Sequence, residues 1–205
     1  MRILRAAAYE AVPWKNGLGT TREILRHPPA AADFIYRLSI AEVTQSGPFS
    51  AFPGTDRIIM LLDGGGFELA FADGRSHALT ARHAPFRFDG GVPAACTVAG
   101  GPSQDLNLMV RRDAARADAD VLRVEGRLIL PPVPGATRLM VALDDSLTVR
   151  HGGQAVALRR WDTACIDATD APADQIHCES AGIAEFFYAA VTPNSGSGES
   201  RSNSP

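Results

Sequence analysis

The chain has 205 residues, of which 45% are hydrophobic and 21% are charged, with a formal net charge of −3 at pH 7. This composition is ordinary for a globular protein with a core, and its acidic balance argues against general nucleic-acid binding. Since no apolar run approaches the roughly 20 residues of a membrane-spanning helix, we expect a cytoplasmic protein without membrane contacts, beginning with mature sequence rather than a signal peptide.

Short runs of β-branched, aromatic and alternating residues recur along the chain, separated by turns rich in Gly, Pro and Asp. The segment 112–119 (RDAARADA) is the best candidate for a short helix or linker. Many short strands at regular spacing predict an all-β sandwich or barrel. We expect strands at 21–25, 34–41, 57–62, 67–72, 85–88, 94–98, 105–111, 121–130, 138–143, 147–150, 155–160 and 184–191.

The chain contains a weak internal repeat. Residues 57–63 (RIIMLLD) resemble residues 138–144 (RLMVALD), and each segment precedes an apolar strand, a Gly turn and a strand with a central Leu. Two aliphatic β-hairpins can also resemble each other by chance, so the repeat alone does not decide whether the chain holds two copies of one unit. Our hypothesis is one unit over 1–192, with halves of about 1–115 and about 116–192. Residues 193–205 lack large apolar side chains, and this composition predicts a disordered tail.

Three of the expected strands carry one apolar face and one polar or mixed face. Such faces either meet solvent or line the mouth of a barrel, where small ligands bind. We regard the members of these polar faces as candidate ligand-binding residues: Thr21 and Glu23 on the first strand, Arg37 and Ser39 on the second, and Asp105, Asn107 and Met109 on the third.

Residues 12–24 (VPWKNGLGTTREI) contain Lys15, the single lysine of a chain with 19 arginines, between Trp14 and Asn16. Because a compact ammonium and a planar guanidinium are not interchangeable, a surviving lysine points to a shaped site. Lys15, Arg37 and Arg57 are candidates for an anion site, and Trp14 for its flat wall.

Each of these side chains also has a simpler interpretation. Trp14 would pack in the core or on the surface, and Arg57 would form a salt bridge with Asp56 or Glu68. Arg37 would orient Glu23 or Asp105 through a buried ion pair.

The segment 46–57 (SGPFSAFPGTDR) has the Pro and Gly content of a loop with a fixed shape. Ser50 and the backbone near Phe49 are candidate donors to a ligand, although turn formation alone explains this composition equally well. The five histidines lack ligand spacing, and the three cysteines, without a CxxC motif, are expected to be buried free thiols. We therefore expect neither a metal nor a cofactor.

Three long segments together are similar to the signature blocks of the HutD/Ves family: PWKNGLGTTREI (13–24), YRLSIAEVTQSGPFSAFPGTDR (36–57) and DLNLMVRR (105–112). The resemblance is specific over about residues 9–125. It implies a double-cupin β-barrel without the metal-binding His cluster of enzymatic cupins. It also implies a bacterial protein associated with histidine-utilisation operons, regarded as a modulator of that pathway that binds urocanate, formylglutamate or formate.

Three positions depart from the family pattern: Leu18 replaces a usual Gly, Tyr36 a usual Trp, and Gly91 a usual acid. These departures concern the identity of the ligand more than the fold. Carried over onto this chain, the blocks supply Trp14, Lys15, Asn16, Gly17, Gly19, Thr21, Glu23, Arg37, Ser39, Gly47, Pro48, Phe49, Ser50, Arg57, Asp105, Asn107, Met109 and Arg111.

We therefore expect a double-cupin protein (bicupin) that binds a small anionic and planar metabolite. A homodimer is one assembly that we consider. Lys15 and Arg57 would hold the carboxylate, while Asn16 and Asn107 would orient the ligand against Trp14. One alternative is a metal-free, isomerase-like enzyme with Glu23 or Asp105 as general base. Another is a protein-interaction regulator, which a large exposed apolar patch would favour.

Overall fold

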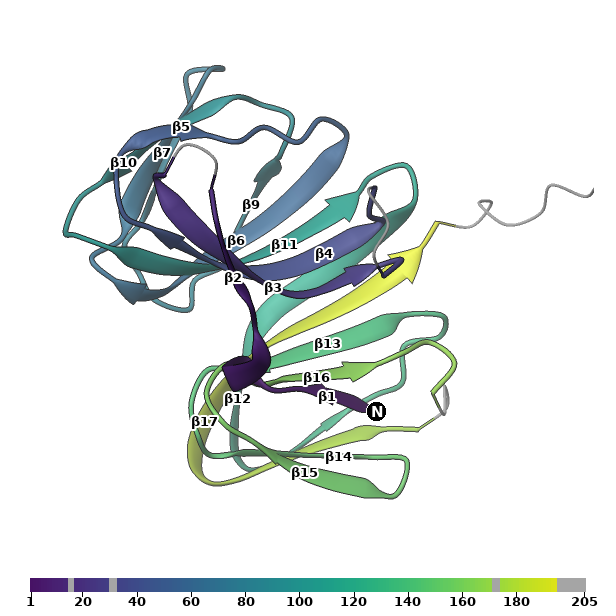
Figure 1. Cartoon of the computed structure of the whole chain (residues 1–205). Helices are drawn as coiled ribbons and strands as arrows, with labels where there is room; N and C mark the ends of the chain where they lie inside the picture. The colour runs from purple at the N-terminus through teal and green to yellow at the C-terminus, as the bar shows by residue number, and fades with distance from the viewer. Residues whose placement is uncertain (15–16, 30–32, 171–173, 195–205) are drawn as a thin grey trace, which may run out of the picture.

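The computed structural model describes residues 1–14, 17–29, 33–170 and 174–194. These residues form three antiparallel sheets and one 3₁₀ turn, η1 (Ala6–Ala8), so the expected all-β architecture is confirmed. Figure 1 shows two stacked lobes, with the N-terminus in the lower one. Lys15, Asn16 and residues 195–205 of the expected tail lie outside the described residues.

Two of the sheets build the upper lobe in Figure 1. The central sheet has the spatial order β2 (Ala11–Pro13), β3 (Gly19–His27), β4 (Tyr36–Val43), β11 (Ser103–Arg111), β6 (Thr55–Gly64) and β9 (Phe86–Asp89). The small sheet has the order β5 (Gly47–Phe49), β10 (Ala94–Val98), β7 (Phe67–Phe71) and β8 (Ser76–Leu79).

The third, large sheet builds the lower lobe. Its order is β1 (Arg2–Leu4), β16 (Thr163–Ile166), β13 (Thr137–Ala142), β17 (Ile176–Pro193), β14 (Leu147–His151) and β15 (Gln154–Leu158), while β12 (Ala115–Leu130) pairs with β17. The N-terminal strand thus lies in a sheet otherwise built from residues 115–193, and β17 continues through Pro193.

The central sheet is buried on both faces, which explains the continuous apolar run of β6. On one face, Ile58 and Met60 join a core with Leu139 and Phe187 of the large sheet. On the other face, Ile59 packs into a separate core with aromatic side chains of the small sheet. Because side chains alternate along β6, one of its faces packs against the large sheet of the lower lobe and the other against the small sheet. The central and small sheets together form the first barrel, and the large sheet forms the second.

The large sheet curls around a third core, made entirely of its own apolar side chains, including Met140, Val149 and Phe186. The two segments of the internal repeat form β6 and β13, and the hairpins β7–β8 and β14–β15 follow them. Apolar side chains pack in the interior of this second barrel, and a polar pocket lies in the first barrel, formed by the central and small sheets.

The expectation of a helix or linker at 112–119 is wrong. Residues 112–114 form a turn, and β12 starts at Ala115. Ala115 is buried and Arg116 exposed, and the strand pairs with β17 from Ala115 to Leu130. This long antiparallel pairing overrides the helix propensity of the four alanines in the segment 112–119.

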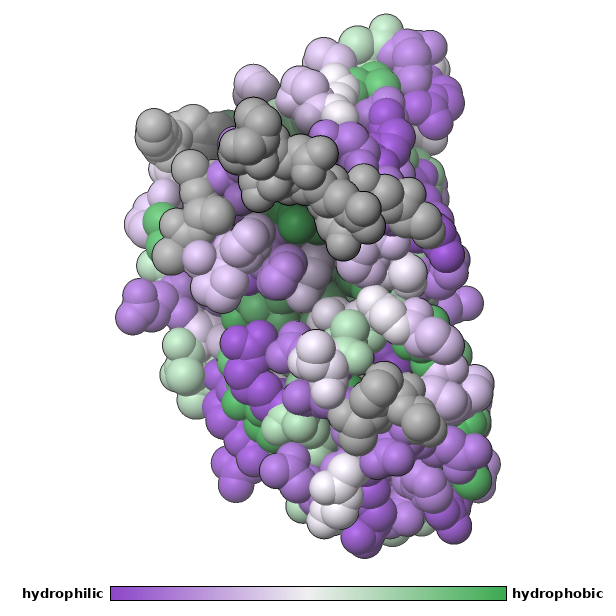
Figure 2. Space-filling model, turned by 90° about the vertical axis from the view of Figure 1, so that its right-hand side faces the viewer, coloured by the Kyte–Doolittle hydropathy of each residue, from purple (hydrophilic) through white to green (hydrophobic). Residues whose placement is uncertain are grey.

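Four short strands, β1, β2, β5 and β16, were not expected from the sequence. Each has three or four residues, too few for a periodic pattern to show. Within the described residues, no helix is long and apolar enough to cross a membrane. The face shown in Figure 2 is mostly hydrophilic, with apolar residues visible in the recess across its middle and in smaller patches toward its edges.

Candidate ligand-binding site

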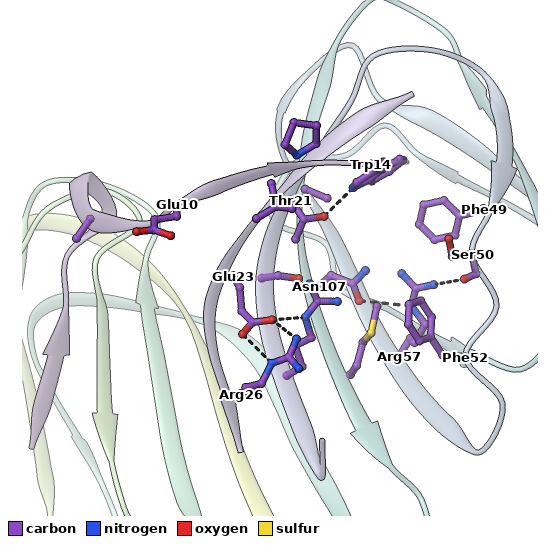
Figure 3. Close-up of a pocket in the computed structure, with 17 residues that line it drawn as sticks. Glu10, Trp14, Thr21, Glu23, Arg26, Phe49, Ser50, Phe52, Arg57 and Asn107 are labelled. Carbon is purple, nitrogen blue, oxygen red and sulfur yellow. Dashed lines mark hydrogen bonds and ion pairs between the residues drawn. The ribbon is translucent and has the colours of Figure 1, made fainter. Parts of the chain in front are cut away.

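A pocket of about 710 Å³ lies against the inner face of the central sheet, under the loop that joins β5 to β6 (Figure 3). Polar side chains cover its floor and aromatic rings part of its wall. The lining residues are Ala8, Glu10, Val12, Pro13, Trp14, Thr21, Glu23, Arg26, Arg37, Ser39, Ala41, Phe49, Ser50, Phe52, Arg57, Asn107 and Met109.

Ten of the thirteen predicted site residues line this pocket: Trp14, Thr21, Glu23, Arg37, Ser39, Phe49, Ser50, Arg57, Asn107 and Met109. The polar faces of the three strands therefore meet around a cavity rather than bulk solvent. Asp105 does not belong to the lining, and Lys15 and Asn16 lie outside the described residues.

The strand register brings these side chains together. Met109 of β11 pairs with Arg37 of β4 and with Arg57 of β6. One step along the same face, Asn107 pairs with Ser39. Since side chains alternate along a strand, members of these rows point to the same side of the sheet. Segments far apart in the sequence thus form one floor.

Arg57 is the central cation of the pocket, and its side chain is buried. Its Nη1 donates to the Ser50 carbonyl at 3.0 Å, and its Nε to Asn107 Oδ1 at 3.5 Å. Burial lowers the pKa of Arg57 to about 10. The alternative of a salt bridge with Asp56 or Glu68 is wrong, because alternation turns Asp56 to the opposite face, where Arg112 binds it at 2.7 Å.

Three aromatic rings surround the Arg57 guanidinium. Its Cζ lies 4.7 Å from the ring centroid of Phe49, 5.4 Å from that of Phe52 and 5.1 Å from that of Phe88. Ring faces attract a cation without neutralising it. The guanidinium keeps its charge, and its Nη2 makes no hydrogen bond with any described residue.

Gly90 makes room for Arg57, a role that the sequence did not reveal. A Cβ at Gly90 would lie 2.8 Å from Arg57 Cδ and 2.8 Å from the Thr55 carbonyl oxygen. The turn DGG at 89–91 predicted a reversal of the chain but not this contact. Phe52 and Phe88 were also not predicted as site residues, although Phe52 lies in the expected loop 46–57 and Phe88 in the expected strand 85–88.

Glu23 forms an ion-pair cluster with two arginines at one side of the pocket. Arg26 Nη2 donates to Glu23 Oε2 at 2.7 Å, and Arg37 Nε donates to the same oxygen at 2.8 Å. Arg26, followed by Arg37, lowers the pKa of Glu23. Of the two acids considered as partners of Arg37, Glu23 is therefore the one it binds. Arg26 was not expected in the site.

Trp14 forms a wall of the pocket at the end of β2. Its indole Nε1 donates to Thr21 Oγ1 at 2.7 Å, and its ring lies against Gly19, where a Cβ would approach Trp14 Cε3 to 3.2 Å. Gly19 is thus required for the close approach of the ring.

The three departures from the family pattern lie away from the polar floor. Leu18 does not have a positive φ, and it fills the space above Gly47, where a Cβ would lie 2.4 Å from Leu18 Cδ1. Tyr36 belongs to the core between the lobes, stacked on His27 with ring centroids 5.1 Å apart. The Gly91 amide donates to Asp89 Oδ1 at 2.8 Å in a turn.

Asp105 lies in the interior of the first barrel with a fully buried side chain. Neither carboxyl oxygen has a hydrogen-bond partner among the described residues. Burial raises the pKa of Asp105 to about 7, against the opposing effect of the Arg57 charge. Asp105 is therefore an ionisable group close to the pocket arginine but not accessible from the pocket.

The arrangement suits the capture of a small oxyanion. The lining contains three arginines and two glutamates, and a fork of guanidinium donors matches a carboxylate. Within the described residues, no group of three or more His, Cys, Asp or Glu side chains is arranged to hold a metal ion.

The curled antiparallel sheets and the ligand-sized pocket define a double-cupin protein. A cupin 2 conserved barrel domain protein from Leptotrichia buccalis superposes with a TM-score of 0.60 at 10% identity, covering 88% of this chain and 92% of that one. This likeness concerns the fold alone.

The chain belongs to the HutD family, whose model matches residues 6–186. Protein Ves from Citrobacter koseri is 46% identical over 109 residues, which make up 53% of this chain and 56% of that protein, so the match spans little more than half of the curated relative.

Two solved structures match over nearly the whole chain. A conserved protein of unknown function from Pseudomonas aeruginosa PAO1 has a TM-score of 0.83 and 35% identity, covering 94% of this chain and 98% of that one. HutD from Pseudomonas fluorescens SBW25, in a formate condition, has a TM-score of 0.80 and 28% identity, with the same coverage of 94% and 98%.

Proposed function

We propose that this protein binds a small carboxylate in the pocket of its first barrel, without a metal, and thereby modulates histidine utilisation. The observation that carries the proposal is Arg57: a buried guanidinium that makes no direct ion pair with a carboxylate of the described residues, and whose Nη2 makes no hydrogen bond to them. A buried charge without a partner is costly, and an anionic ligand relieves this cost.

The other pocket side chains suit a planar metabolite such as urocanate or formylglutamate, or formate alone. The Trp14 ring offers a face for stacking, and Asn107 and Ser39 offer hydrogen bonds. Lys15 and Asn16 remain predicted ligand contacts, on the sequence argument alone.

Calorimetry with formate, urocanate and formylglutamate tests the proposal. We expect binding of at least one of them at millimolar concentration or tighter, and a loss of about tenfold or more in Arg57→Met. Arg75→Met is the matched control, because Arg75 pairs with Asp73 on an exposed turn and does not line the pocket. Equal affinities of Arg57→Met and wild-type protein would contradict the proposal.

A metal-free enzyme is the second candidate, since the raised pKa of Asp105 suits a general base. Two observations weigh against it: Asp105 is not part of the pocket lining, and two arginines make Glu23 a weak base. Turnover of any of the three metabolites, followed by NMR, would favour catalysis over binding. The third candidate, a protein-interaction regulator, would be favoured by a large exposed apolar patch. On the described surface, the exposed large apolar residues are Val12, Ile129 and Ile183.

A further inference from the structure

The buried carboxyl of Asp105 has no role in the proposed binding step. Its side chain is 0% exposed, and both oxygens lack a hydrogen-bond partner among the described residues. An ionised carboxylate in such a place lacks both solvation and hydrogen bonds. Its position therefore favours the neutral acid unless a nearby positive charge stabilises the anion.

Asp105 lies next to the floor of the pocket, on the same face of the central sheet. It shares a face of β11 with Asn107 and Met109, and it pairs with Ala41 on β4 and Leu61 on β6. Ala41, Asn107 and Met109 all line the pocket. The carboxyl is thus a neighbour of the lining residues but does not itself line the pocket.

The groups around Asp105 identify its electrostatic partner. Arg57 of β6 is the cation whose charge acts on it, and Arg37 of β4 acts in turn on Arg57. From the small sheet, Cys96 of β10 faces Asp105, and burial raises the pKa of this thiol to about 11. The Arg37 guanidinium is already held by Glu23. Arg57 is therefore the counter-charge of Asp105.

We propose that a carboxylate binding at Arg57 displaces Asp105 as the counter-charge, so that Asp105 takes up a proton from solvent as the ligand binds. The inference rests on the proposed function and adds a proton linkage to it. Two negative charges near one buried cation repel each other strongly at low dielectric, and protonation of the inaccessible carboxyl removes that repulsion. Affinity is then highest at low pH and falls as pH rises through the ionisation of Asp105.

Calorimetry with formylglutamate in two buffers of different ionisation enthalpy measures this proton directly. The ligand has no group that titrates between about pH 6 and pH 9, so uptake reports on the protein. We expect uptake of a sizeable fraction of one proton near neutral pH, and a Kd that rises up to about tenfold per pH unit above it. In Asp105→Asn, uptake should vanish and the Kd should stay flat with pH.

Asp56→Asn is the matched control, because Asp56 is an exposed carboxylate on β6 that pairs with Arg112. This variant should keep the wild-type uptake and pH profile. Binding without proton uptake, or uptake that persists in Asp105→Asn, overturns the inference and leaves the proposed function intact. Absence of binding of formylglutamate, urocanate and formate at every pH overturns both. If Asp105→Asn does not fold, NMR titration of the aspartate carboxyls of the wild-type protein, with and without ligand, tests the inference instead. A pKa of Asp105 that the ligand does not raise would contradict it.

Discussion

At the scale of single residues, the pocket depends on a buried arginine that keeps its charge. Phe49, Phe52 and Phe88 flank the guanidinium of Arg57, and the Ser50 carbonyl fixes one of its nitrogens. A planar guanidinium suits this stacked position better than an ammonium would.

The first prediction concerns the stability cost of Asp105. Its pKa in the folded protein, about 7, exceeds the ordinary value of about 4 in the unfolded chain. The folded state therefore binds more protons between these values, and stability falls as pH rises through that window. We expect Asp105→Asn to be more stable than wild type at neutral pH by about 1–3 kcal/mol.

Urea denaturation at a series of pH values measures this difference. It should grow between about pH 4 and about pH 7, and it should disappear below about pH 4, where the wild-type carboxyl is protonated in both states. A constant difference across this range would contradict the assignment of a buried, ionisable Asp105.

The second prediction concerns Gly90, which has no contact with the proposed ligand. A Cβ in Gly90→Ala would clash with Arg57 Cδ and with the Thr55 carbonyl oxygen, so Arg57 must shift. We expect about tenfold weaker carboxylate binding and a stability loss of about 1–2 kcal/mol. Gly182→Ala, where a Cβ meets nothing within 4 Å, should change neither quantity. Unchanged affinity in Gly90→Ala, measured by calorimetry, would exclude the positioning role.

At the scale of strands, alternation explains why much of the site could be predicted from the sequence. Arg37 and Ser39 on β4, and Asn107 and Met109 on β11, were assigned to polar faces, and the register places them in adjacent rows. The bulge between Glu23 and Leu25 in β3 shifts the alternation by one residue, so that Arg26 pairs with Arg37 and lies on the pocket side together with Glu23.

Other features could not be predicted, because they depend on contacts between distant segments. Gly90 makes room for Arg57 across a turn, and Arg26 joins Glu23 only through the geometry of a bulged strand. The long strand β12 was misassigned at its start, since its pairing with β17 outweighs local propensity.

At the scale of the whole molecule, the two lobes share one core. Leu38 and Leu106 of the central sheet pack with Leu139 and Phe187 of the large sheet, and all four side chains are at most 1% exposed. Neither lobe could separate without exposing these side chains to water, which is unfavourable. The shared core indicates that the lobes depend on each other for stability.

The third prediction is that both lobes unfold in a single transition. Trp14 lies in the first lobe and Trp161 packs against the core between the lobes, so Trp14→Phe and Trp161→Phe variants each leave one fluorescent reporter. We expect the fluorescence change of each remaining tryptophan to coincide with the change in far-UV circular dichroism. Leu139→Ala should lower stability by about 2–4 kcal/mol by both probes. Separate midpoints for the two probes within either variant would show that the lobes unfold independently.

The central claim is that Arg57 holds the carboxylate of the ligand. A crystal structure of the protein with formylglutamate tests it most directly. We predict a carboxylate oxygen within hydrogen-bond distance of Arg57 Nη2, with the ligand alongside Trp14 in the pocket of the first barrel. Formylglutamate bound elsewhere, with the Arg57 guanidinium contacting only Ser50, Asn107 and its aromatic neighbours, would contradict the account.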